Sequence, residues 1–162
     1  MDADSILREH LLATLHGGHA YQPFDQTVAD FPEAAMNSCP PNVPYTPWHL
    51  LEHIRIAQND ILEFTRDPKY VSPEWPKGYW PAADETTDRA GWEKTLQGFR
   101  ADMADLVAMV KDPAINLTAP IPHAPDYTIL REILLVADHN AFHLGEFAIL
   151  RAVMNSWPAR HH

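Results

Sequence analysis

Apolar residues recur at the three-to-four-residue spacing of an α-helix in four separate stretches of this chain, and prolines separate the stretches. The chain contains 15 prolines, which is roughly twice the average share. Because proline inside a helix costs about 3 kcal/mol or more, long proline-free stretches favour helices. These stretches are residues 1–22, 48–67, 82–112 and 126–157. They predict helices near residues 3–16, 47–66, 86–111 and 127–154.

Start and stop signals support these boundaries. Gly17-Gly18 provides an end for the first helix. Thr46 is a capping residue followed by Pro47 at the first helical position, and Asp67-Pro68 ends that helix. The last stretch is apolar on nearly all sides over residues 129–153, which is typical of a helix packed against several others.

The connections between the helices are long, rich in proline and aromatic residues, and too apolar for free linkers. They cover residues 19–45 and 68–85, and residues 24–36 are expected to add a short helical piece. We expect these connections to wrap the helices and to shape the mouth of a pocket. No strand alternation of useful length is present. The predicted fold is therefore all-α: an antiparallel four-helix bundle with long Pro-rich connections, forming one domain over residues 1–162.

Charge and composition narrow the function. The chain carries 12 Lys and Arg against 22 Asp and Glu, a net charge of −10, which disfavours nucleic-acid binding. The longest aliphatic run, residues 133–137, cannot cross a bilayer, and the acidic N-terminus does not resemble a signal peptide. We therefore expect a soluble, cytoplasmic protein without a membrane partner. With Cys39 as its one cysteine, the chain must hold any metal through histidine and carboxylate groups.

Three of the ten histidines form a candidate metal site. His139 and His143 are four residues apart in the apolar last helix, so both imidazoles lie on one helix face. In the second helix, His53 lies about 60° from the centre of the apolar stripe and His49 about 100°, so His53 is the inward one. Three histidines from facing helices would leave a position open for water or substrate on one divalent ion. Imidazole suits zinc, nickel or iron.

Two rival metal sites can be considered. Residues His49 to His53 spell H-x-x-E-H, a zinc-peptidase motif in which both histidines bind metal and Glu52 activates water. That interpretation leaves His139 and His143 unexplained. A di-iron site needs E-x-x-H pairs, and none of the nine glutamates is followed by histidine at that spacing.

The helices and histidines together resemble the DinB-like family, the DinB/YfiT superfamily of bacterial metalloenzymes. The resemblance rests on GGHA (17–20), PWHLLEHI (47–54) and above all DHNAFHLGE (138–146). It implies a four-helix bundle, frequently a homodimer, with His53, His139 and His143 as ligands of one divalent metal. Phe142 and Glu146 depart from the family pattern, which commonly has His and Gln there. Some relatives are thiol-dependent transferases or isomerases, and others are labelled hydrolases.

A metal with an open position can activate water or a thiol for attack on a small-molecule substrate. The expected chemistry is therefore hydrolysis or S-transfer, the latter with a low-molecular-weight thiol as cosubstrate. Asp60, Glu132 and Glu146 are the candidate proton acceptors, because each lies on roughly the same helix face as a ligand. Each can also serve as an outer partner of a ligand or as a surface charge. The competing hypothesis is a non-catalytic metal-binding or structural bundle.

Overall fold

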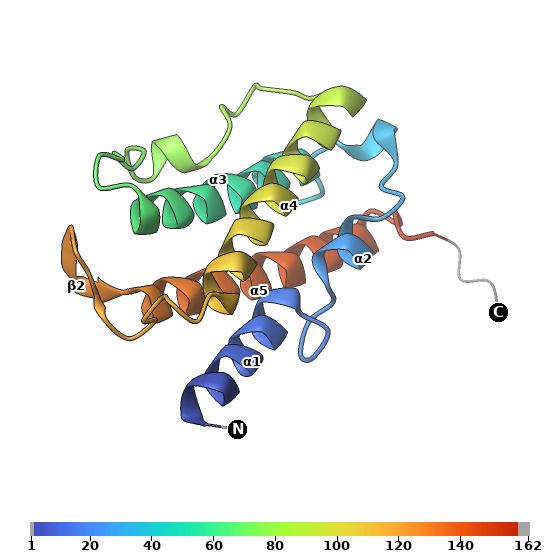
Figure 1. The fold of residues 1–162 in the computed structure, drawn as a ribbon. Coiled ribbons are helices and arrows are strands. Elements are labelled where there is room, and N and C mark those ends of the chain that lie inside the picture. The colour runs from blue at the N-terminus through green and yellow to red at the C-terminus, as the bar shows by residue number, and fades with distance from the viewer. Residues whose placement is uncertain (1, 159–162) are drawn as a thin grey trace.

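The computed structural model describes residues 2–158, which form a mainly helical structure (Figure 1). Within these residues the α-helices are α1 (Ala3–His16), α2 (Phe24–Val28), α3 (Pro47–Arg66), α4 (Arg89–Lys111) and α5 (Ile129–Val153). Two short strands, β1 (Pro120–Ile121) and β2 (Ala124–Thr128), pair antiparallel before α5. Single 3₁₀ turns at Glu33–Ala35 and Lys77–Tyr79 lie in the long connections.

The four long helices predicted from the sequence are confirmed, and each begins at a capping side chain. Asp2, Thr46, Asp88 and Thr128 each accept a hydrogen bond from the backbone N–H three residues on. The Asp88 cap places the start of α4 at residue 89 rather than 86. The expected short helical piece is also confirmed, since α2 and the first 3₁₀ turn both fall within residues 24–36.

The β1–β2 hairpin was not predicted, and it delays the start of α5 from residue 127 to 129. Thr128 pairs with Pro120 across the hairpin and then caps α5 through its hydroxyl. The two strands have two and five residues, and their one fully buried side chain is Ile121. Such short strands carry no readable alternation of polar and apolar positions.

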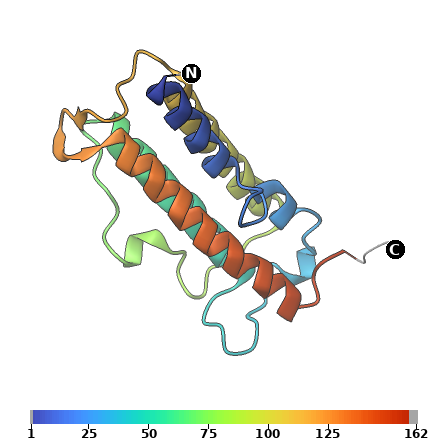
Figure 2. The ribbon, with the colours of Figure 1, turned by 90° about the horizontal axis from the view of Figure 1, so that it is seen from below.

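The long helices pack in two pairs, with α5 beside α3 and α1 beside α4 (Figure 2). In addition, α3 packs against α4, and α1 packs against α5. The connections close one end of the core: Phe31 stacks on Trp92 with ring centres 4.9 Å apart, and Phe24 stacks on Phe99 at 3.7 Å. The first connection therefore adds aromatic side chains to the core, in keeping with the expectation that it is too apolar for a free linker. In the second connection Trp75 is 73% exposed.

The last helix is central to this packing. It contacts α1, α2, α3 and β2, so the prediction of a helix packed on several sides is confirmed. By length and composition alone, α5 is also apolar enough to cross a membrane. Yet it buries several polar side chains inside the protein, among them Glu132, Asn140 and Arg151. The buried side of this helix is therefore explained by its place in the core, while other apolar side chains of α5 are exposed.

Arg151 is a fully buried cation that ties α5 to two other segments. Its guanidinium donates to the backbone carbonyls of Thr27, Ala29 and Ser156 at 2.7–2.8 Å. The aromatic ring of Trp157 lies 4.1 Å from the guanidinium carbon. These contacts attach the C-terminal end of α2 and the residues after α5 to the core helix.

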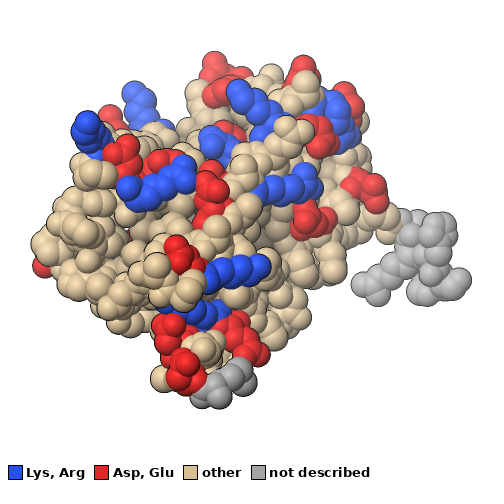
Figure 3. Space-filling model, in the orientation of Figure 1, with Lys and Arg blue, Asp and Glu red and all other residues tan. Residues whose placement is uncertain are grey.

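We predict that Arg151→Met lowers the free energy of unfolding by about 3 kcal/mol, because three buried carbonyls lose a charged donor. Arg66→Met is the matched control, since Arg66 is exposed and pairs with Glu63 and Asp105 at the surface. Acidic and basic side chains lie side by side over the face in Figure 3, and exposed pairs contribute about 0–1 kcal/mol each. Urea denaturation measures both variants, and equal losses would contradict this account.

Candidate metal centre

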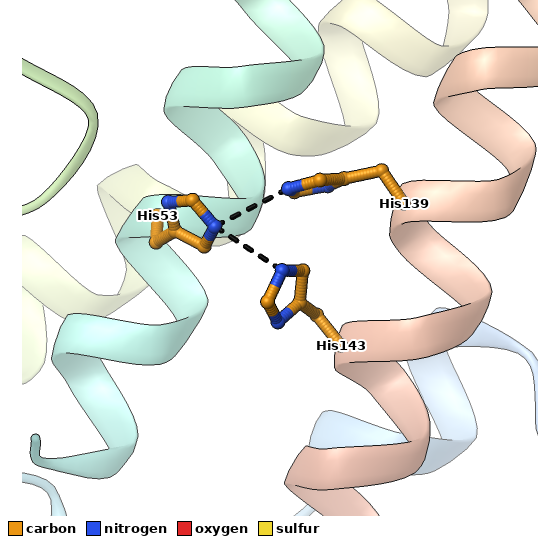
Figure 4. A group of neighbouring side chains, drawn as sticks. All are labelled: His53, His139 and His143. Carbon is orange, nitrogen blue, oxygen red and sulfur yellow. Dashed lines mark hydrogen bonds between the residues drawn. The ribbon is translucent and has the colours of Figure 1, made fainter. Parts of the chain in front are cut away.

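Three histidine side chains from two helices converge in the core beside the long connection that follows α3. His53 comes from α3, and His139 and His143 come from successive turns of α5 (Figure 4). His53 is 3% exposed, as its inward position in the apolar stripe predicted, and the other two are half-buried. One nitrogen from each ring lies within 4.8 Å of the other two, so the group could hold a metal ion.

The outer contacts of two rings fix which nitrogen carries a proton. His53 Nδ1 lies 2.8 Å from the carbonyl oxygen of Tyr79, and His143 Nδ1 lies 2.6 Å from Oε2 of Glu146. A carbonyl and a carboxylate can only accept, so both Nδ1 atoms must donate. In each neutral ring the inward-facing Nε2 atom therefore bears an unprotonated lone pair.

These two lone pairs face each other. His53 Nε2 is 3.2 Å from His143 Nε2 and also 3.2 Å from His139 Nε2. Neutral His53 and His143 cannot hydrogen-bond across that gap while both Nδ1 atoms keep their protons, so either a proton or a metal ion between the two Nε2 atoms would balance the lone pairs. Two imidazole nitrogens bound tetrahedrally at about 2.0–2.1 Å would lie about 3.3–3.4 Å apart. The two pairs that include His53 are close to that value, and all three nitrogens lie within 4.8 Å of one another.

Burial favours the neutral form of His53 and His139, which is the form that binds a cation. Desolvation lowers the pKa of His53 to about 4, with the neighbouring His143 contributing in the same direction. Desolvation, followed by the neighbouring histidines, also lowers the pKa of His139 to about 4. His139 differs from the other two rings because its Nδ1 is buried without a hydrogen-bond partner among the described residues. Its orientation is therefore set by packing and by the contact of its Nε2 with His53.

Aromatic side chains form a wall beside the cluster. The Trp80 ring lies flat on His53, with ring centres 3.9 Å apart and planes 5° apart, and Tyr45 lies 5.2 Å from Trp80. Phe142 meets His143 edge-on at 4.9 Å and is 63% exposed. The sequence indicated that the connections would border a pocket, but periodicity offered no sign that Tyr79 and Trp80 contact His53.

The three predicted proton acceptors occupy different places. Glu146 touches the cluster directly through His143 Nδ1. Asp60 accepts from the Tyr79 hydroxyl at 2.7 Å, so it reaches His53 only through Tyr79. Glu132 is buried and accepts from Arg131, away from the three rings. Burial, together with the bond to Asp60, raises the pKa of Tyr79 to about 12, so its hydroxyl stays a donor.

Both ring nitrogens of His49 already have hydrogen-bond partners, which argues against a metal site formed by the H-x-x-E-H motif. Its Nε2 lies 2.8 Å from the carbonyl oxygen of Glu85, and its Nδ1 takes part in the cap of α3 at Thr46. The carboxylate of Glu52 accepts from Arg55 and from the Thr95 hydroxyl. Of the motif's three named residues, His53 belongs to the histidine cluster, whereas His49 and Glu52 do not. His49 is buried, rather than at the flank of the stripe as predicted.

Comparison with known families places this geometry in context. A sequence model of the DinB superfamily matches residues 18–147, about four-fifths of the chain, including all three clustered histidines. The chain belongs to the DinB superfamily. No curated protein and no solved structure matches it. Where the DinB pattern commonly has Gln, this member has Glu146, and that carboxylate now accounts for the orientation of His143.

We predict that replacing His53, His139 or His143 by Ala lowers metal affinity more than the roughly 10–100-fold that loss of an outer partner costs. His49→Ala is the matched control and should keep its metal while losing some stability through the weakened cap. Elemental analysis after purification without metal-affinity chromatography measures this. Metal retained in all three single variants would contradict the assignment.

A second prediction concerns acid stability of the metal-free protein. The pKa values of His53 and His139 are about 4 in the fold and about 6.5 in the unfolded chain. The unfolded state thus binds more protons between these values, so the free energy of unfolding falls as pH drops from about 6.5 towards 4. The His53→Gln, His139→Gln double variant should lose less over that window in urea titrations with a chelator present. An unchanged pH dependence in the double variant would refute this.

Proposed function

We propose that this DinB protein is a cytoplasmic, metal-dependent enzyme that acts on a small molecule by hydrolysis or S-transfer. His53, His139 and His143 would hold one divalent ion: zinc, nickel or iron. The observation that carries the proposal is the pair of Nε2 lone pairs facing each other at 3.2 Å. When bound, such an ion supplies Lewis acidity that favours deprotonation of a water or thiol at its open position.

The protein groups around the cluster support a catalytic rather than a structural role for the metal site. A closed structural site has four protein ligands. Among the described residues, the cluster brings together three histidines with no fourth His, Cys, Asp or Glu. His139 and His143 are only half-buried, unlike His53. This favours a position for water, a low-molecular-weight thiol or substrate over the non-catalytic alternative.

The remaining residues position the ligands. The Tyr79 carbonyl and the Trp80 ring hold His53 from the same connection, and Glu146 holds the proton on His143 Nδ1. The frame is, in our proposal, the antiparallel four-helix bundle of the family, built from α1, α3, α4 and α5. In that frame α3 and α5 supply the facing ligand positions.

The test is turnover by protein loaded separately with zinc, nickel and iron. A p-nitrophenyl ester reports hydrolysis, and an electrophilic arene with a small thiol reports S-transfer. We expect metal-dependent turnover in one of the two assays and its loss in His139→Ala. Glu146→Gln should still bind the metal, but the metal affinity or the turnover rate should fall by about 10–100-fold. A bound metal with no exchangeable water, measured by solvent relaxation of a paramagnetic ion, would support the structural alternative.

We also propose that the protein is a homodimer formed by the outward face of α5. Leu134, Phe142, Ile149 and Val153 on this helix are 48–68% exposed. A second copy of the same face is the occupant we favour, because self-pairing would cover both apolar stripes at once.

Light scattering should therefore give twice the 18.4 kDa chain mass for the native protein. Ile149→Glu should give the monomer mass, since a charge would be buried in the contact. A matched substitution away from this face, Val71→Glu, should leave the dimer intact because Val71 lies in the connection after α3. Native protein that is monomeric at micromolar concentration would exclude this arrangement.

A further inference from the structure

Asp60 is a buried carboxylate on α3, seven residues beyond His53. It is 9% exposed, and because seven residues are close to two helical turns, its side chain lies on the same face of α3 as His53. An ionised carboxylate in such a position costs free energy unless hydrogen-bond donors surround it. The donors beside Asp60 therefore decide whether the position is tolerated.

Two tyrosines of the connection after α3 lie beside this carboxylate. The Tyr79 hydroxyl donates to Asp60 Oδ2 at 2.7 Å. Tyr70 is the second neighbour, because burial, followed by the nearby Asp60 carboxylate, raises the pKa of its hydroxyl to about 12. Both hydroxyls therefore keep their protons and can serve as donors to Asp60.

Tyr79 differs from Tyr70 because it bonds to two residues of α3 at once. Its backbone carbonyl accepts the Nδ1 proton of His53 at 2.8 Å, while its hydroxyl donates to Asp60. None of the hydrogen bonds that His53 makes within the described residues involves Tyr70. Tyr79 therefore links the buried carboxylate to the histidine cluster, and Tyr70 does not.

The connection that carries Tyr79 is largely exposed before it reaches the cluster. Val71 is 85% exposed and Trp75 is 73% exposed, and Tyr79 ends a single 3₁₀ turn. The next residue, Trp80, stacks flat on His53. The position of this turn thus determines both the carbonyl and the ring that contact His53, and the bond from Tyr79 to Asp60 attaches the turn to α3.

We propose that Asp60 is a positioning residue for His53: by holding Tyr79, it fixes the tautomer and the orientation of this imidazole. The bond from His53 Nδ1 to the Tyr79 carbonyl keeps Nε2 free to bind a cation. Asp60 acts through Tyr79 as an anchor, and not as a proton acceptor in the reaction. The importance of this anchor for metal binding rests on the proposed function, but its effect on the tautomer is measured on metal-free protein.

Tyr79→Phe and Tyr70→Phe are a matched pair of variants, because each removes one hydroxyl beside the same carboxylate. Long-range ¹H–¹⁵N NMR spectra of the imidazoles, recorded on metal-free protein well above the His53 pKa of about 4, report the tautomer. In the native protein and in Tyr70→Phe, His53 should carry its proton on Nδ1 alone. In Tyr79→Phe we expect a mixture with the tautomer protonated on Nε2.

Metal affinity is the second readout, measured by competition with a chromophoric chelator for zinc. Tyr79→Phe and Asp60→Ala should each weaken zinc binding by about tenfold, at the low end of what the loss of an outer partner costs. Asp60→Asn should restore most of the affinity, because its amide oxygen can still accept from Tyr79. The double variant Asp60→Ala, Tyr79→Phe should bind no more weakly than either single variant, since both changes remove the same bond.

An unchanged His53 tautomer in Tyr79→Phe would overturn the proposal, whether or not zinc binds. An equal effect of Tyr70→Phe would also overturn it, because the cause would then be a general loss of packing around Asp60. Native protein that binds no zinc, with the tautomer change confined to Tyr79→Phe, would reject the proposed function and still support the positioning role of Asp60.

Discussion

The central constraint in this structure is the close approach of two imidazole nitrogens, Nε2 of His53 and Nε2 of His143, which lie 3.2 Å apart. Both carry unprotonated lone pairs in the neutral rings. The arrangement is unfavourable unless a cation lies between them. The Tyr79 carbonyl fixes the tautomer of His53 from one side, and the carboxylate of Glu146 fixes that of His143 from the other. Outer partners of this kind are typical of histidines that bind metals.

The fold supplies the rigidity that such an arrangement needs. α5 is packed on several sides, so His139 and His143 stand on a helix whose position is determined by the whole core. The connection after α3 folds back along α3, where Trp80 stacks on His53 and Tyr79 donates a hydrogen bond to Asp60. Arg151 fastens α2 and the chain beyond α5 to the same core helix. The ligands are thus held by contacts that span most of the chain.

The sequence was sufficient to predict the long helices and the three clustered histidines, for physical reasons that can be named. Prolines marked the ends of the helices, and helical spacing placed His53 inward and His139 with His143 on one face. It could not reveal that Tyr79 and Trp80 meet His53, because these contacts depend on how an irregular connection returns to the core. The β1–β2 hairpin was missed because its strands are too short for a pattern.

The central claim is that three imidazoles hold one divalent ion and leave a position open. X-ray absorption at the metal edge, on protein purified without affinity chromatography, tests it most directly. The account predicts three imidazole nitrogens at about 2.0–2.1 Å with their outer-shell scattering, together with one or more oxygen neighbours. A spectrum without imidazole outer-shell scattering, or with four imidazoles and no oxygen, would contradict it.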